Sequence, residues 1–158
     1  DTMLSSEIPQ RISEALSACI ARYAQEVDPA IPTVVGAHLT VSTGIFSGSE
    51  KRAIYGNDPM LHVHELAHPV FDYVALGHLH RHQNLNAHGA PPVVYSGSIE
   101  RVDFGERNEP KGFCLVTISD DGIERSTDYS FIEVPTRPFI QIDVSLTEQP
   151  GISQTAQI

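Results

Sequence analysis

Three histidines lie close together in the segment YVALGHLHRHQ, residues 73–83, namely His78, His80 and His82. Neutral imidazole binds first-row metal ions such as manganese, iron, cobalt and zinc, so this segment could form part of a metal site. Gly77 precedes the first of these histidines and would let the backbone turn closely around an ion. Histidines near strand ends also bind carbonyl groups or water, so the spacing alone is a weak indication of a metal site.

Three strand-forming runs end in polar or glycine-containing segments, and these runs must position the histidines. They lie in TVVGAHLTVSTG, FDYVALGHLHRHQ and PVVYSGSIERVDFGE, which begin at residues 33, 71 and 92. TVVGA and FDYVAL do not alternate apolar and polar residues, which is typical of strands buried on both faces. Ligands of open α/β sheets bind beyond the carboxyl ends of the strands. His38, which follows the first run, and the His78/His80 pair are placed as such ligand-binding residues would be.

The segments around these runs predict a helix and a pair of strands. Between Ile8 and Val27 apolar residues recur at spacings of three and four, which places them on one helical face. Pro9 suits the first turn of this helix, and Ser5 or Ser6 can cap it. The predicted apolar face consists of Ile8, Ile12, Leu16, Cys19, Ile20, Tyr23 and Val27. KGFCLVTI, the turn sequence SDDG and the alternating residues 123–134 predict two further strands.

Two other segments have weaker patterns. Residues 39–60 are rich in glycine, serine and threonine and predict mostly loop, with a short strand at RAIY, residues 52–55. Pro135 and Pro138 interrupt the strand pattern before FIQIDVSL, residues 139–146, whose period of two predicts the first strand of a new unit.

Length and composition favour a single domain in a reducing compartment. The 158 residues are enough for one domain with a core, and Cys19 and Cys114 lie far apart in a chain without a secretory segment. Twenty acidic residues against ten basic ones give a formal charge of −10, which by itself argues against nucleic-acid binding. The chain starts at Asp1 and ends in GISQTAQI without a clear stop, so we expect it to be a fragment.

A second histidine pattern competes with the first. GNDPMLHVH, residues 56–64, fits the opening Gly-x5-His-x-His of a cupin metal site, but no Glu follows at the required spacing and the second cupin motif is missing. We therefore interpret this match as chance. The histidines that lie in polar loops without a matching partner are expected to take no part in the chemistry; these are His62, His64, His68, His82 and His88.

The segments VVGAHLTVSTGIFSGSE, FDYVALGHLHRHQ, VVYSGSIERVDFGE and KGFCLVTI, in this order and spacing, resemble the second half of the nuclease domain of SbcD-type exonucleases, which are calcineurin-like metallophosphoesterases. The resemblance covers roughly residues 8–134. It implies an α/β fold class: half of a metallophosphoesterase β-sandwich with flanking helices in residues 1–134. Residues 135–158 would then be the linker and the start of a capping, DNA-binding domain, which would hold the basic surface that this acidic chain lacks.

The resemblance also implies a site with two divalent metal ions, usually Mn²⁺. His38 would be the lone histidine of the family and His78 and His80 the Gly-His-x-His pair, so that His38 and His78 share one ion and His80 binds the other. The chain contains no Asp-x-His, Gly-Asp-x-x-Asp or Gly-Asn-His motif. The bridging aspartate, the asparagine ligand and the assisting histidine would therefore lie upstream of Asp1. We expect the fragment alone to bind metal weakly and to cleave nothing, because three imidazoles leave the coordination shells incomplete.

Other residues of the matching segments have weaker assignments. Gly97 and Ser98 could bring backbone close to the metals or the scissile phosphate, or could simply form a turn. Arg81 could bind a phosphate through two N–H groups or could be solvated. The charged residues of the last motif are expected to form ion pairs that hold their loop; these are Arg101, Asp103, Glu106 and Arg107.

For the parent protein the resemblance implies a cytoplasmic bacterial enzyme that hydrolyses phosphodiester bonds at DNA ends during repair and recombination. Its partners would be DNA and an SbcC-type ATPase, with a homodimer in the full-length protein and no membrane. Two alternatives stay open at this point. One is a calcineurin-like phosphatase or nucleotidase that acts on small phosphate esters, and the other is a metal-binding domain without catalysis.

Overall fold

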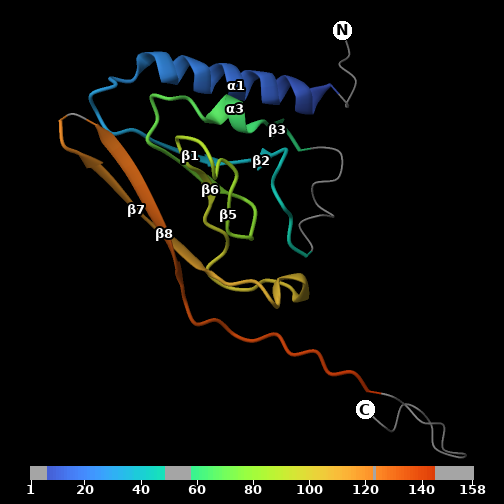
Figure 1. Ribbon diagram of the computed structural model, residues 1–158. Helices are drawn as coiled ribbons and strands as arrows, with labels where there is room; N and C mark the ends of the chain where they lie inside the picture. Colours follow the sequence, from blue (N-terminus) through green and yellow to red (C-terminus); the bar gives the residue numbers. More distant parts are fainter. Residues whose placement is uncertain (1–6, 49–57, 123, 145–158) are drawn as a thin grey trace, which may run out of the picture.

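A computed structural model describes residues 7–48, 58–122 and 124–144 of the chain. Its elements are, in chain order, α1 (Ile8–Glu26), β1 (Val34–His38), β2 (Thr40–Val41), β3 (Met60–Leu61), α3 (Val63–Leu66), β4 (Tyr73–Gly77), β5 (Gln83–Asn84), β6 (Val93–Tyr95), the short 3-10 helix η1 (Phe104–Glu106), β7 (Gly112–Asp120) and β8 (Arg125–Glu133). The fold is thus mixed α/β. Figure 1 shows α1 along one side of the central strands and the β7–β8 hairpin on the other side.

The central sheet has the strand order β1-β4-β6-β5. Strands β1, β4 and β6 run parallel, with His38 opposite Gly77 and Leu76 opposite Tyr95, so their carboxyl ends meet at one edge of the sheet. The prediction that these three runs form strands is confirmed. Strands β4 and β6 are mostly buried, as expected, but β1 alternates between exposed and half-buried residues. The predicted burial of β1 on both faces is wrong because β1 lies at the edge of the sheet, where Val34 is 52% exposed.

The core lies between the central sheet, the short parallel β2–β3 pair and the two helices. It consists of Val41, Leu61, Leu66, Val74, Leu76, Leu79, Val93 and Tyr95. Helix α1 packs against this core through Ile20 and contacts α3 and β3. The Tyr95 hydroxyl donates a hydrogen bond to the carbonyl of Leu39 (2.7 Å) and accepts one from the N–H of Val41 (3.0 Å), which ties β6 to the segment that follows His38.

Helix α1 has the predicted length, but its predicted apolar face is not buried. No residue of α1 is buried, and four of the seven apolar residues are strongly exposed, namely Ile8, Ile12, Leu16 and Tyr23. The half-buried residues of α1 include Ser13, Ser17, Ile20 and Ala24, and of these just Ile20 belongs to the predicted face. Helix α1 is therefore rotated relative to the orientation that the apolar pattern predicts. Glu7 occupies the N-cap without a side-chain cap hydrogen bond, and Pro9 lies in the first turn as predicted, whereas Ser5 and Ser6 lie outside the described residues.

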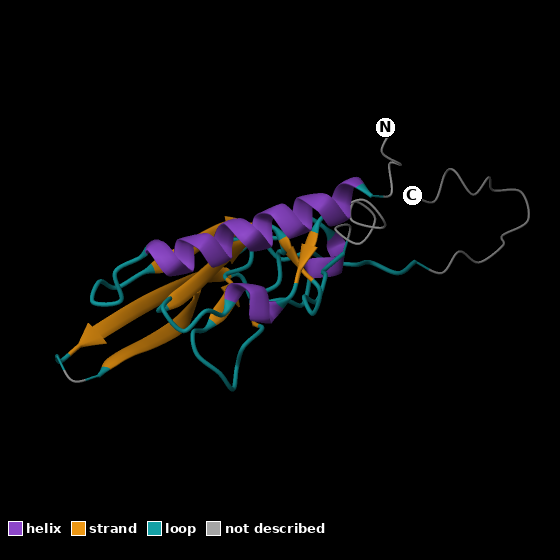
Figure 2. Ribbon diagram, turned by 90° about the horizontal axis from the view of Figure 1, so that it is seen from above, coloured by secondary structure: helices purple, strands orange, loops and turns teal. Residues whose placement is uncertain are grey.

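Strands β7 and β8 form the predicted antiparallel hairpin, in which Gly112 pairs with Glu133 and Asp120 with Arg125. The hairpin lies beside the central sheet in both views (Figures 1 and 2). Arg125 joins it to the loop before β1, because its guanidinium donates to the carbonyls of Pro29 (3.1 Å) and Ala30 (2.8 Å) and lies 3.5 Å from the Asp72 carboxylate.

Three parts of the chain differ from the predicted pattern or cannot be compared with it. The segment 139–144 contains no strand, so the strand expected in 139–146 is not formed there, and 145–146 lie outside the described residues. The RAIY segment, 52–55, also lies outside them. The short elements β2, β3, α3, β5 and η1 were not predicted, because two to four residues are too few for a recognisable period.

Candidate metal centre

His38 and His78 come together at the carboxyl ends of β1 and β4. Their ring centroids are 5.1 Å apart with an interplanar angle of 64°. The parallel pairing of His38 with Gly77 brings about this contact, since His78 is the next residue along the chain. A Cβ at Gly77 would lie 3.0 Å from Nδ1 of His38, so the glycine leaves room for the imidazole ring.

The backbone of His78 is held in an unusual conformation. Its φ angle is +103°, and it is the one non-glycine residue with positive φ in the described part of the chain. Such a conformation costs about 1–3 kcal/mol and persists only where the surrounding structure imposes it; it is found most often at functional sites. Nε2 of His78 is buried and takes part in no hydrogen bond, and the nearest carboxylate, Asp58 Oδ2, is 3.5 Å away.

A pocket of about 200 Å³ lies at this point. It is lined by Leu16, His38, Leu39, Thr40, Asp58, Pro59 and His78. Among the described residues, just two buried side-chain polar atoms lack a hydrogen-bond partner, Thr40 Oγ1 and His78 Nε2, and both belong to residues that line this pocket. Leaving such atoms unpaired costs about 1–3 kcal/mol each, so their concentration in one pocket indicates a ligand.

The donor set of this pocket fits a divalent cation. An imidazole nitrogen, a carboxylate and a hydroxyl are all ligands of first-row metals, and the pocket is lined by an acidic side chain but by no lysine or arginine. The set is nevertheless small. Within the described parts of the chain, no three His, Cys, Asp or Glu side chains are arranged to hold one metal ion.

His80 lies in a different environment, beside a buried ion network. Its Nδ1 is 2.8 Å from Oε1 of Glu106, whose side chain is fully buried. Oε2 of Glu106 is 2.7 Å from Nζ of Lys111, which is also fully buried and lies 3.3 Å from Oε2 of Glu109. Burial raises the pKa of Glu106, but hydrogen bonds from Lys111 and His80 outweigh it, so the pKa is lowered overall. Glu106 is therefore ionised at neutral pH.

The loop after β6 supports the backbone of His80. The carbonyl of His80 accepts hydrogen bonds from the N–H of Ser98 (3.1 Å) and from Nζ of Lys111 (3.0 Å). Gly97 has a φ of +81°, and a Cβ there would lie 2.8 Å from the His80 carbonyl oxygen and 2.9 Å from the His82 nitrogen. Gly97 and Ser98 thus have a clear role in packing against the His78–His82 loop.

The other charged residues of the loop contact it mainly through backbone groups. The Arg101 guanidinium donates to the carbonyls of Glu106 (3.3 Å) and Glu109 (3.0 Å) and to the hydroxyl of Thr136. Asp103 caps η1 by accepting from the N–H of Gly105 (2.6 Å), and Arg107 donates to the Phe104 carbonyl. The expected loop-holding ion pair exists for Glu106, but its partner is Lys111.

The remaining predicted residues are separate from the pocket. Arg81 is exposed, and its guanidinium forms no ion pair with a described residue. His82 stacks on Phe131 of β8 at 4.2 Å and lies 3.0 Å from the Tyr95 carbonyl, so it joins the sheet to the hairpin. Burial lowers the pKa of His82, which agrees with its predicted lack of a chemical role.

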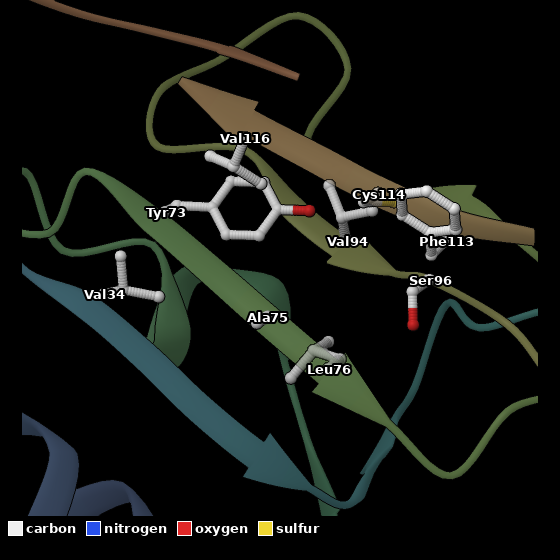
Figure 3. A pocket seen from close by; sticks show the side chains of 9 residues that line it. All are labelled: Val34, Tyr73, Ala75, Leu76, Val94, Ser96, Phe113, Cys114 and Val116. Atoms are coloured by element: carbon white, nitrogen blue, oxygen red, sulfur yellow. The ribbon is translucent and has the colours of Figure 1, made fainter. Parts of the chain in front are cut away.

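A second pocket lies between the sheet and the hairpin. Its volume is about 320 Å³. Figure 3 shows side chains of β4 and β6 facing those of β7. It is lined by Val34, Tyr73, Ala75, Leu76, Val94, Ser96, Phe113, Cys114 and Val116. Because these residues are mostly apolar and include none of the predicted ligands, this pocket is not the metal centre.

The sequence did not predict three residues that contact the proposed ligands. Asp58 lies beside His78, Glu106 contacts the His80 ring, and Lys111 donates to the His80 carbonyl. Asp58 belongs to the sequence GND, residues 56–58, which lacks the histidine of the Gly-Asn-His motif. Lys111 is one of the few lysines of the chain and directly precedes a strand, which is the weak indication that could have drawn attention to it.

Comparison with known proteins agrees with the motifs. No family model matches the chain. The SbcD component of the SbcCD nuclease from Staphylococcus epidermidis is 30% identical over 131 residues, which is 83% of this chain. The resemblance to SbcD is thereby confirmed. The matched part is 32% of the length of the staphylococcal SbcD, so this SbcD-like chain spans about a third of its relative. In the described residues no helix is long and apolar enough to cross a membrane.

Proposed function

We propose that this SbcD-like chain forms part of the nuclease domain of a metal-dependent exonuclease and endonuclease that hydrolyses phosphodiester bonds at DNA ends in repair and recombination. Its partners would be DNA and an SbcC-type ATPase. The observation that carries the proposal is the pocket at His38 and His78, whose lining residues hold both unpaired buried polar atoms of the described chain. The similarity to SbcD supports a nuclease over a phosphatase of small esters.

In this proposal His38 and His78 hold one divalent ion, with Asp58 beside them, and His80 holds a second one. Two such ions, Mn²⁺ by the resemblance, would polarise the phosphodiester and lower the pKa of a bound water. His78 presents Nε2 to the pocket without a competing hydrogen bond. His80 is oriented by Glu106, which keeps its ring in a fixed place. Arg81, Gly97 and Ser98 stay weaker candidates for contacts with phosphate.

The chain by itself is proposed to bind metal weakly and to have no nuclease activity. Its described residues supply too few ligands to complete two coordination shells. A protein that carries this chain together with the Asp-x-His, Gly-Asp-x-x-Asp and Gly-Asn-His motifs should be active. With Mn²⁺, it should degrade linear duplex DNA much faster than a nitrophenyl phosphodiester, whereas the reverse preference would favour the phosphatase alternative.

The substitution His78→Gly tests the site itself. Glycine adopts the positive φ of residue 78 without strain, so the variant should fold, but it lacks the imidazole. In the protein that carries this chain together with the missing motifs, we expect this variant to lose hydrolysis of DNA, while circular dichroism and the unfolding midpoint stay unchanged. His88→Gly, at an exposed histidine, is the matched control and should keep activity. Full activity of His78→Gly would refute the assigned role.

A further inference from the structure

The side chain of Glu106 meets three donors. Oε1 faces Nδ1 of His80 at 2.8 Å, while Oε2 faces Nζ of Lys111 at 2.7 Å and the N–H of Val102 at 3.3 Å. A carboxylate can only accept hydrogen bonds. In neutral His80 the proton must therefore be on Nδ1, which leaves the lone pair on Nε2.

The position of Glu106 is itself fixed. It is the last residue of η1, its N–H donates to the Asp103 carbonyl (3.2 Å), and its carbonyl accepts from Nε of Arg101 (3.3 Å). The Lys111 ammonium that pairs with it also donates to the His80 carbonyl. The Glu106–Lys111 pair thus holds His80 at both its ring and its backbone, and both partners are fully buried.

We propose that Glu106 is a positioning residue for His80: it sets the Nδ1–H tautomer, which puts on Nε2 the lone pair that a divalent metal ion would need. The link to metal rests on the proposed function, but the control of the tautomer does not. A carboxylate that accepts from the second nitrogen of a histidine ligand also makes that ligand more basic, and removing it typically weakens metal binding about 10–100-fold.

The substitution Glu106→Gln should reverse the tautomer. Two donors, Lys111 and Val102, meet the Oε2 position, whereas one donor meets Oε1. The amide oxygen of the introduced glutamine is therefore expected on the Lys111 side, and its NH₂ group should face His80. An NH₂ group needs an acceptor, so the proton of His80 must move from Nδ1 to Nε2.

Glu109→Gln is the matched control. Glu109 is the other carboxylate beside Lys111, at 3.3 Å, and it also accepts from the Ser47 hydroxyl at 2.9 Å. Its substitution also removes one negative charge from the neighbourhood of Lys111 but leaves the Glu106–His80 contact in place. Any general loss of packing should affect both variants, whereas the tautomer of His80 should change in Glu106→Gln and stay the same in Glu109→Gln.

The tautomer can be measured in the 158-residue chain by two-bond ¹H–¹⁵N correlation of labelled histidine rings, at about pH 8, where an unperturbed histidine is neutral. We expect Nδ1–H for His80 in the wild type and Glu109→Gln, and Nε2–H in Glu106→Gln. His82, whose Nδ1 faces a carbonyl, is the internal reference and should keep Nδ1–H in all three. An Nδ1–H tautomer of His80 in Glu106→Gln would overturn the inference.

Titration with Mn²⁺ alone, followed by broadening of the histidine ring signals, separates this inference from the proposed function. Glu106→Gln should need about 10–100 times more Mn²⁺ than Glu109→Gln for the same broadening of His80. If both variants need the same Mn²⁺ concentration, Glu106 does not strengthen metal binding by His80, and this part of the inference is overturned. If Mn²⁺ broadens no His80 signal in any version while the tautomer still reverses, the proposed metal role of His80 fails and its control by Glu106 stands.

Discussion

Substitution of Gly97 by alanine should weaken the support of the His80 loop, and two other glycines of the chain allow its cost to be separated into parts. Gly97 combines a positive φ of +81° with a tight contact, since a Cβ would lie 2.8 Å from the His80 carbonyl oxygen. Gly122 has nearly the same φ, +80°, but nothing lies within 4 Å of its Cβ position. Gly36 has neither a positive φ nor a neighbour within 4 Å.

The expected costs follow from these differences. Gly36→Ala should stabilise the chain by about 0.4–1 kcal/mol at most, because alanine restricts the unfolded chain. Gly122→Ala should cost about 1–2 kcal/mol for the left-handed conformation. Gly97→Ala adds overpacking against backbone atoms, which cannot rotate aside, at about 1–3 kcal/mol more. Its total cost is therefore about 2–5 kcal/mol, a large share of the roughly 5–15 kcal/mol stability of a domain.

Urea unfolding of the 158-residue chain, followed by circular dichroism, measures all three variants. The slope with denaturant should stay the same, so that shifts of the midpoint report stability. The decisive quantity is the difference between Gly97→Ala and Gly122→Ala, because the φ cost cancels in it. If the two variants are equally destabilised to within about 0.5 kcal/mol, a typical limit for independent sites, the close approach of Gly97 to His80 and His82 is refuted.

Two further predictions concern the links between the hairpin and the sheet. Arg125→Met should destabilise the chain by about 1.5–3 kcal/mol, since it removes charge-assisted and carbonyl hydrogen bonds at a side chain that is 16% exposed. The control Arg22→Met, at an exposed ion pair, should cost less than about 0.5 kcal/mol in the same urea assay. Equal costs of the two substitutions would contradict the role of Arg125. Because burial lowers the pKa of His82, the unfolded state takes up a proton at this histidine below about pH 6.5 while the folded state does not, so the free energy of unfolding should fall from there toward the folded pKa. His82→Asn should flatten this fall in unfolding curves measured between about pH 7.5 and 5. Parallel pH dependences of the variant and the wild type would contradict the prediction.

Much of the sheet could be predicted from the sequence because its strands are encoded locally. TVVGA, FDYVAL and PVVYSGS are β-branched or aromatic runs bounded by glycine, proline or polar residues, and each contains or overlaps a strand. The hairpin followed from the SDDG turn between two strand patterns. The closeness of His38 and His78 could then be inferred from the rule that parallel strands place their carboxyl ends at one edge of the sheet.

The rest depends on contacts that no local pattern contains. The apolar stripe of α1 is largely exposed because the position of a helix is set by the surface available to it, here α3 and β3, and Ile20 alone of the stripe is packed on the core. The burial of Glu106 could not be inferred, since an acidic residue in a loop is normally solvated unless it is paired. Its partners Lys111 and His80 are placed by the segment before β7 and by the loop after β4.

The two halves of the proposed metal centre are held in different ways, so each should respond to a different kind of change. His78 is placed by a strained backbone beside an open pocket, and its geometry depends on φ and on the room that Gly77 leaves for His38. His80 is placed by a buried ion network, so its geometry depends on charge. Substitutions that alter backbone freedom should therefore act on the His38–His78 pocket, and substitutions that neutralise a carboxylate should act on His80. A site built on both could lose one ligand environment while the other is still intact, since the two share no hydrogen-bond partner among the described residues.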